Sequence, residues 1–130
     1  MYRATTRSIQ VTVKPSFLGD RSSPDESRYF WAYTIEILNL GIDTVQLRSR
    51  AWHITDGNGR AQDVVGPGVI GKQPVLRPGE SFEYTSGCPL TTPSGIMVGT
   101  YAMETEAGES FDVAIPAFSL DIPNSPRQLN

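Results

Sequence analysis

Residues 64–87 read VVGPGVIGKQPVLRPGESFEYTSG and lie in the middle of a chain of 130 residues. Five glycines and three prolines divide this stretch into short apolar runs, so no part of it can continue as a helix. Segments that alternate between apolar and polar residues precede it and follow it. The stretch therefore predicts a tight corner at which the chain passes from one β-sheet to another.

The flanking segments alternate with a period of two, which is typical of strands that have one buried face. In the longest of them, residues 29–40, Trp31, Tyr33 and Ile35 share one face, and Phe30 lies on the other. Shorter segments of this kind cover residues 9–13, 45–47, 52–54, 81–86, 96–104 and 111–115. Seven or more short strands without a helix predict an all-β protein, either a two-sheet sandwich or a small barrel.

Two local patterns predict details of the strands. The apolar residues Val45 and Leu47 have odd numbers, whereas Trp52 and Ile54 have even numbers. One regular strand cannot bury both pairs, so a β-bulge or bend is expected between Leu47 and Trp52. The sequence Asp-Gly-Asn-Gly at 56–59 predicts a hairpin turn, because Gly and Asn tolerate the positive φ angles of such turns.

Prolines and polar runs predict where the strands end. We expect Pro15 and Pro116 to end their strands, since proline lacks the N–H that a strand ladder uses. Residues 16–28 are polar and predict a long loop. Residues 88–95 predict an irregular crossing between strands.

Length and composition limit the class of protein. The length fits a single domain, which we place at residues 8–123, between a flexible N-terminus (1–7) and a flexible C-terminal tail (124–130). The net charge is −3, with no block of like charge, and this argues against a nucleic-acid partner. No apolar run approaches the roughly 20 residues that span a bilayer, so no membrane association is expected. Cys88 is the single cysteine, which excludes an internal disulfide and favours the cytoplasm.

The central stretch imitates two phosphate-binding motifs. Residues 66–71 fit G-x-G-x-x-G, and Gly66, Gly71 and Lys72 match most of a P-loop. Both motifs require a helix after the glycines, because its N-terminal amides grip the phosphate, and Pro74 and Pro78 prevent that helix. The structural alternative is that the glycines permit a corner between sheets.

A weaker anion site remains open. Successive backbone amides in a glycine turn can hold an anion without a helix. The candidate residues for such a phosphate site are Gly66, Gly68, Gly71, Lys72 and Arg77.

Other candidates for catalysis or metal binding have simpler interpretations. His53 is the single histidine and is expected on the solvent face of its strand, without a nucleophile and an orienting acid placed beside it. Cys88 is expected to be a small buried residue, and Asp56 a turn residue. One His, one Cys and scattered carboxylates do not form a metal signature. We therefore predict no catalytic residues, no metal site and no cofactor.

Taken together, these motifs closely resemble the ApaG family, and the resemblance covers about residues 8–123. The segments that carry it are YFWAYTIEILNLG (29–41), RAWHITDGNG (50–59), VGPGVIGKQPVLRPGE (65–80), FEYTSG (82–87), TPSGIMVGTYAM (92–103) and IPAFSL (115–120). The resemblance implies an antiparallel, fibronectin type III-like (immunoglobulin-like) β-sandwich in a bacterial cytoplasmic protein. It also implies a link to cobalt resistance and magnesium efflux, and a gene neighbourhood that includes diadenosine tetraphosphate hydrolysis. Similar domains occur in eukaryotic F-box proteins and in a DNA-polymerase-interacting protein, and the family brings no established catalytic residues.

Two functions from different classes follow from these observations. The first is a non-enzymatic module that binds an unknown protein partner, with an indirect link to divalent-cation homeostasis. The alternative is a protein that binds phosphate or a nucleotide, such as a dinucleoside polyphosphate, through residues 66–72. The sequence leaves the partner and the oligomeric state open.

Overall fold

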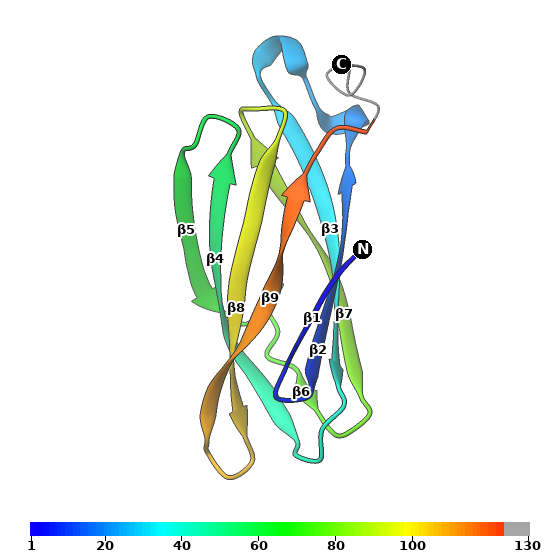
Figure 1. Cartoon of the computed structure of the whole chain (residues 1–130), viewed down its shortest axis with the longest axis vertical. Coiled ribbons are helices and arrows are strands. Elements are labelled where there is room, and N and C mark those ends of the chain that lie inside the picture. The colour runs from blue at the N-terminus through cyan, green and yellow to red at the C-terminus, as the bar shows by residue number, and fades with distance from the viewer. Residues whose placement is uncertain (124–130) are drawn as a thin grey trace.

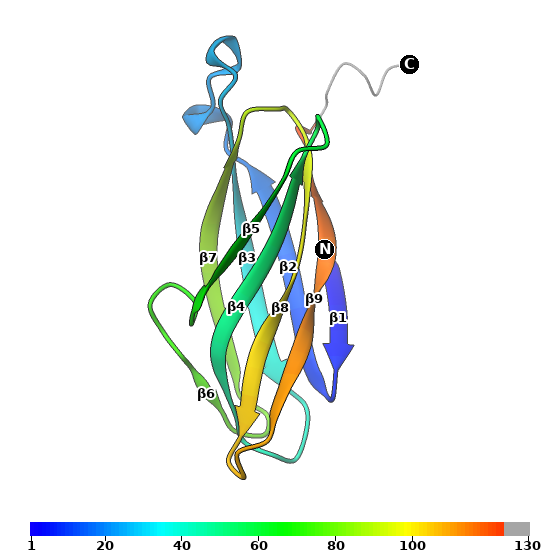
Figure 2. The same ribbon diagram turned by 90° about the vertical axis from the view of Figure 1, so that its left-hand side faces the viewer.

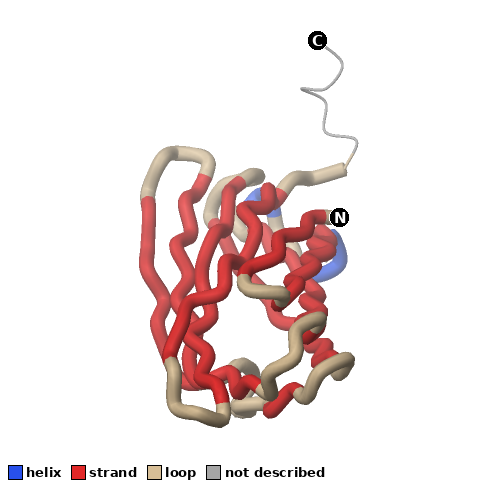
Figure 3. The backbone as a smooth tube through the Cα atoms, turned by 60° about the horizontal axis from the view of Figure 1, so that its bottom comes forward, coloured by secondary structure: helices blue, strands red, loops and turns tan. Residues whose placement is uncertain are grey.

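The computed structural model describes residues 1–123, and its two antiparallel sheets pack face to face as a sandwich (Figure 1; Figure 3). The first sheet has the strand order β1-β2-β3-β7, with β1 (Tyr2–Thr6), β2 (Ile9–Phe17), β3 (Tyr29–Asn39) and β7 (Ser81–Leu90). The second has the order β5-β4-β8-β9, with β4 (Val45–Asp56), β5 (Ala61–Pro67), β8 (Gly95–Thr105) and β9 (Ser110–Leu120). The short β6 (Val75–Leu76) pairs with the start of β4, and two 3-10 turns, η1 (Gly19–Arg21) and η2 (Pro24–Glu26), precede β3. The predicted all-β sandwich is confirmed.

Alternating residues of the longest strand build the core, as the sequence predicts. Trp31, Tyr33, Ile35 and Ile37 of β3 are all buried. The ring of Tyr33 meets the rings of two residues from the second sheet, Trp52 at 5.5 Å and Phe118 at 5.8 Å between centroids. Burial of an aromatic side chain of this size stabilises the fold by about 2 kcal/mol. These contacts hold the two sheets together near the middle of the sandwich.

Two local predictions are confirmed. The register of β4 against β8 shifts between Leu47 and Ser49, so the bulge lies within the predicted interval and lets both ends of β4 face the core. The hairpin at 56–59 joins β4 to β5, and Asp56 Oδ1 accepts hydrogen bonds from the amides of Asn58 and Arg60. The side chain of Asp56 is therefore the turn former that the sequence predicts.

Both proline predictions were wrong. β2 continues through Pro15 to Phe17, because β1 pairs with β2 only as far as Val13 and so needs no N–H from Pro15. β9 continues through Pro116, which lies in a bulge where the register against β8 shifts between Met97 and Gly99. A proline at an edge or in a bulge does not end a strand.

The expected limits of the domain also need correction. The N-terminus, expected to be flexible at residues 1–7, forms β1, whose side chains alternate and whose residues 2–6 pair with β2. Residues 88–90, expected to belong to an irregular crossing, continue β7, because they pair with residues 29–31 of β3. The tail at 124–130 lies outside the described residues. Within residues 1–123, no helix has the length and apolar character of a membrane span.

The two sides of the sandwich are closed differently. On one side β9 lies beside β1 (Figure 2), and the Tyr2 hydroxyl is 2.8 Å from Ser119 Oγ. The amide of Ala114 donates to Thr6 Oγ1 at 3.1 Å on the same side. On the other side, β5 and β7 are the edge strands of the two sheets, and the connection from β5 to β6 projects there. This open side positions the candidate site.

Polar hydroxyls are buried between the sheets. Tyr84 of the first sheet and Tyr101 of the second hydrogen-bond to each other through their hydroxyls. Burial raises the pKa of both phenols, and the Tyr84–Tyr101 contact adds to the rise for Tyr101. Burial likewise raises the pKa of Tyr33 and brings that of the Cys88 thiol to about 11. The folded state therefore prefers the neutral forms of all four groups.

These shifts predict a loss of stability in alkali. An unfolded thiol or phenol ionises at lower pH than its buried counterpart, so the unfolded state releases protons first and the free energy of unfolding falls as pH rises. We expect the contribution of these groups to the free energy of unfolding, measured with urea, to be constant below about pH 8.5 and to decline from about pH 9 upward.

The double variant Tyr84→Phe/Tyr101→Phe should flatten this decline, because it removes two of the phenols and leaves no unpaired hydroxyl behind. Tyr29→Phe, at a half-buried tyrosine outside the hydroxyl pair, is the matched control. An equally steep decline in the double variant and in wild type would contradict this account.

Candidate functional site

The edges of β5 and β7 border a groove, here called the edge groove, that contains two adjoining cavities. One cavity, the arginine pocket, has a volume of about 660 Å³. The other, the tyrosine pocket, has a volume of about 340 Å³. Ile54, Gln62 and Pro89 line both, so the two cavities form one continuous depression along the open side.

The tyrosine pocket reaches the buried hydroxyls between the sheets. Tyr33, Tyr84 and Ser86 line it from the first sheet, and Arg50 from the second. Ser86 and the positive charge of Arg50 oppose the effect of burial on the pKa of Tyr33, and Arg50 does the same for Tyr84. Cys88 also lies here, buried as predicted, and its raised pKa keeps it a neutral thiol at neutral pH.

The glycine motif forms a small hairpin that fills the mouth of this pocket. Val69 is 1 % exposed and packs into the core. The amide of Val69 donates to the Lys72 carbonyl, and the amide of Lys72 donates to the Val69 carbonyl. Gly68 has a φ angle of +61°, and a Cβ there would collide with the Lys72 carbonyl oxygen. The motif thus places the side chain of Val69 in the core between the two sheets.

Arg50 fixes the start of this hairpin. Its Nη1 donates to the carbonyl oxygens of Pro67 and Gly68, both at 3.0 Å. A Cβ on Gly66 would lie 3.0 Å from the same nitrogen, so glycine leaves room for the guanidinium to lie against β5. The groups that meet a charged partner here are carbonyls, which bind a cation and not a phosphate.

The structure places three of the five predicted phosphate-site residues, Gly68, Gly71 and Lys72, in the connection between β5 and β6. Gly66 lies in β5 just before this connection, and Arg77 belongs to a separate turn in which its amide donates to Glu80 Oε1. The amide of Gly68 donates to the Arg48 carbonyl, as does the side chain of Gln73, which stands where a P-loop has Ser or Thr. The chain then enters β6 and not a helix.

At the tip, the amides of Ile70 and Gly71 remain available to an anion beside Lys72. Phosphate binding therefore stays a prediction. The prediction requires that the wild-type protein binds pyrophosphate saturably and that Lys72→Ala weakens this binding. If neither protein bound pyrophosphate at millimolar concentration, the hypothesis would end.

Ile70 is a feature that sequence reasoning missed. It has a φ angle of +44° and Gly71 one of +79°, so the two form the kind of hairpin turn for which Asn-Gly is preferred. A β-branched residue in this conformation is a strained outlier. Its side chain lines the tyrosine pocket and is nevertheless 54 % exposed. The signal in the sequence was Gly71 at the second position of a two-residue turn, which Val69 and Lys72 close by their backbone hydrogen bonds. This turn was not predicted.

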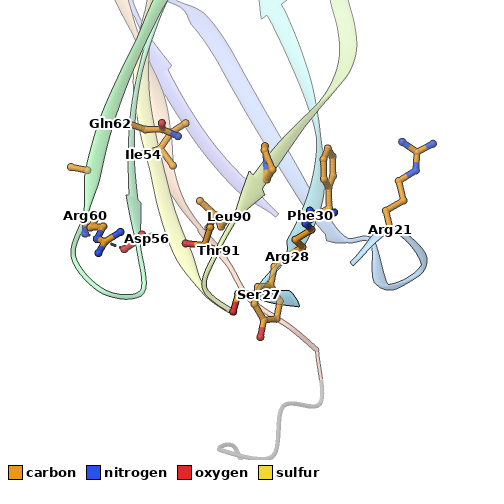
Figure 4. Close-up of a pocket in the computed structure, with 13 residues that line it drawn as sticks. Arg21, Ser27, Arg28, Phe30, Ile54, Asp56, Arg60, Gln62, Leu90 and Thr91 are labelled. Atoms are coloured by element: carbon orange, nitrogen blue, oxygen red, sulfur yellow. Dashed lines mark hydrogen bonds between the residues drawn. The ribbon is translucent and has the colours of Figure 1, made fainter. Parts of the chain in front are cut away.

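Three arginines from separate segments line the arginine pocket, and the guanidinium of Arg21 points away from the other two. The β4–β5 hairpin carries Arg60, the residue before β3 is Arg28, and Arg21 lies in η1 (Figure 4). Ile54, Leu90 and Phe30 supply the apolar walls (Figure 4). Phe30, on the second face of the first sheet, is half-buried and lies over Gly87. No pattern in the sequence indicates that these segments meet.

The remaining candidates lie away from the groove. His53 is on the outer face of the second sheet, where its Nδ1 is 2.7 Å from Asp63 Oδ1. Both side chains are more than half exposed. No group of three or more His, Cys, Asp or Glu side chains in the described part of the chain could hold a metal ion.

Known proteins resemble this chain over its whole length. Residues 19–105 match the family described as the ApaG domain. The chain is 65 % identical to Protein ApaG of Methylobacterium sp. (strain 4-46) and 62 % identical to Protein ApaG of Mesorhizobium japonicum, with 100 % of each chain covered. A crystal structure of a Bordetella pertussis protein described as ApaA superposes with a TM-score of 0.88 at 47 % identity, covering 93 % of this chain and 98 % of that one.

The two positive-φ glycines of the hairpin should respond differently to alanine. Gly68→Ala should lower the free energy of unfolding by about 3 kcal/mol, because it adds a left-handed alanine and a collision with a backbone carbonyl. Gly71→Ala should cost only about 1 kcal/mol, because a Cβ there meets nothing within 4 Å. Urea unfolding of the two variants checks this order. Equal losses in the free energy of unfolding would contradict the close approach of Gly68 to the Lys72 carbonyl.

Proposed function

This chain belongs to the ApaG domain family, and from that premise we propose that it is a non-enzymatic module that binds a protein partner at the edge groove. The link to cobalt and magnesium is then indirect and passes through the partner. The proposed setting is the bacterial cytoplasm.

Ile70 is the observation that carries the proposal. The folded chain holds an isoleucine in a conformation that costs about 1 kcal/mol or more, and it leaves that apolar side chain in water. Asparagine would relieve the strain at no loss of core packing, because the side chain of Ile70 is more than half exposed. A strained and exposed apolar residue at the mouth of a groove is typical of a contact that a partner covers.

The positions of the reactive side chains favour recognition over catalysis. His53 points to the outer face of the second sheet, whereas Cys88 is buried between the sheets. A nucleophile and a base must be within hydrogen-bond reach of each other to act together. The carboxylate beside His53, Asp63, is a surface group on the edge strand β5.

Ile70→Asn should separate stability from recognition. We expect this variant to gain about 1 kcal/mol in the free energy of unfolding, because Asn-Gly suits the turn, and to lose partner binding. Affinity capture from a bacterial lysate would compare wild type, Ile70→Asn and the control Val75→Asn, at an exposed valine of β6 outside both pockets.

The supporting result is a protein enriched by wild type and by Val75→Asn but absent with Ile70→Asn. If wild type enriched nothing, or if Ile70→Asn enriched the same protein, the proposed site would be wrong. Urea unfolding of the same samples shows that any loss of capture does not come from loss of the fold.

A further inference from the structure

The free edge of β5 leads directly into the arginine pocket. The amide of Asp56 donates to the Arg60 carbonyl, and the amide of Gly68 donates to the Arg48 carbonyl, so the β4–β5 hydrogen bonds are fixed at both ends. Because bonded and non-bonded pairs alternate in an antiparallel ladder, Ala61, Asp63 and Val65 direct their backbone N–H and C=O groups away from β4. All three residues are exposed.

This edge can accept another strand over a defined length. Pro67 has no N–H, and its carbonyl is already bound by Arg50, so pairing stops there. At the other end, Ala61 and Gln62 both line the arginine pocket. An extended segment that pairs with β5 would therefore carry its end into that pocket.

The charge of the pocket indicates what that end carries. Arg21, Arg28 and Arg60 surround it, and the one acidic side chain in its lining, Asp56, has its Oδ1 occupied by two backbone amides. The two ion pairs that join described residues to each other, Arg7–Glu109 and His53–Asp63, both lie outside this lining. The concentration of three cations in a chain of net charge −3 leaves a local excess that a carboxylate would neutralise.

The walls of the same pocket favour an apolar side chain beside the carboxylate. Ile54 and Leu90 form its floor and Phe30 one flank, between the hairpin and the end of β7 (Figure 4). A cavity of about 660 Å³ has room for more than one side chain.

We infer that the occupant is an extended, acidic peptide segment of the partner, which adds a strand to β5 and inserts an apolar side chain into the arginine pocket with a neighbouring Asp or Glu on Arg28 or Arg60. This inference rests on the proposed function, since it names the chemistry of the partner for the same groove. A small anion alone would use the arginines but leave the β5 edge unpaired.

A peptide library displayed on phage and selected on the full-length protein tests the inference. We expect the enriched peptides to carry Asp or Glu next to Leu, Ile or Phe. The enriched sequence, made as a synthetic peptide, should bind about tenfold more weakly to Arg28→Gln/Arg60→Gln, and more weakly to wild type as salt increases. Arg3→Gln/Lys14→Gln, which removes two charges from the outer face of the first sheet, is the charge-matched control and should bind as wild type does.

A backbone readout identifies strand addition. On binding, the amides of Asp63 and Val65 should become protected from hydrogen exchange. Val65→Pro, which removes an outward N–H, should abolish binding, whereas Val65→Ala should retain most of it.

The outcomes separate this inference from the proposed function. Enriched peptides without an acidic preference, or peptides that bind Arg28→Gln/Arg60→Gln normally, would overturn the inference and leave an Ile70-dependent partner in place. Binding of pyrophosphate or acetate at the arginines, with no enriched peptide, would show a small-anion site and overturn it too. If no peptide were enriched while Ile70-dependent capture succeeded, the partner would not be an extended acidic segment.

Discussion

The guanidinium of Arg50 binds the carbonyls of Pro67 and Gly68, and this contact sets the position of the β5–β6 connection over the side of the sandwich between β5 and β7. It fixes the start of the hairpin that places Val69 between the sheets. Gly66 leaves room for this contact, since a Cβ there would lie 3.0 Å from Arg50 Nη1. A charged group that binds two carbonyls in a partly buried place holds a loop more firmly than neutral hydrogen bonds do. The path of the chain from β5 to β6, and hence the shape of the groove, follows from it.

The two sides of the sandwich divide stability and recognition between them. On the side of β1 and β9, side-chain and backbone groups of the two sheets bond to each other, and an ion pair joins Arg7 to Glu109. On the side of β5 and β7, an edge strand is exposed, Ile70 is strained and three arginines lack a carboxylate partner among the described residues. Natural chains tolerate such departures from local rules mainly at functional sites.

Features that depend on neighbouring residues could be predicted from the sequence. The alternation of residues 29–40 predicted the core of β3, and the change of parity between Leu47 and Trp52 predicted the bulge. The predictions failed at Pro15, at Pro116 and at residues 2–6, where the answer depends on which strand lies alongside. The missing N–H of a proline ends a strand only where a neighbouring strand would accept a hydrogen bond from it. A short polar strand such as β1 forms only where the edge of another strand is free to pair with it.

The sequence by itself determined an all-β chain of short strands, its main buried face and the absence of the helix that a nucleotide cradle needs, because all three follow from residue spacing and backbone chemistry. The antiparallel sandwich was implied by the resemblance to the ApaG family, and spacing alone left a small barrel open. Only the tertiary structure decided what the glycines do: Gly66 makes room for Arg50, Gly68 avoids a carbonyl, and Gly71 allows a turn. The arginine pocket was likewise beyond the sequence, since its walls come from residues 21–30, 54–62 and 89–91. These segments meet because two sheets pack face to face, and that packing depends on contacts between residues far apart in the chain.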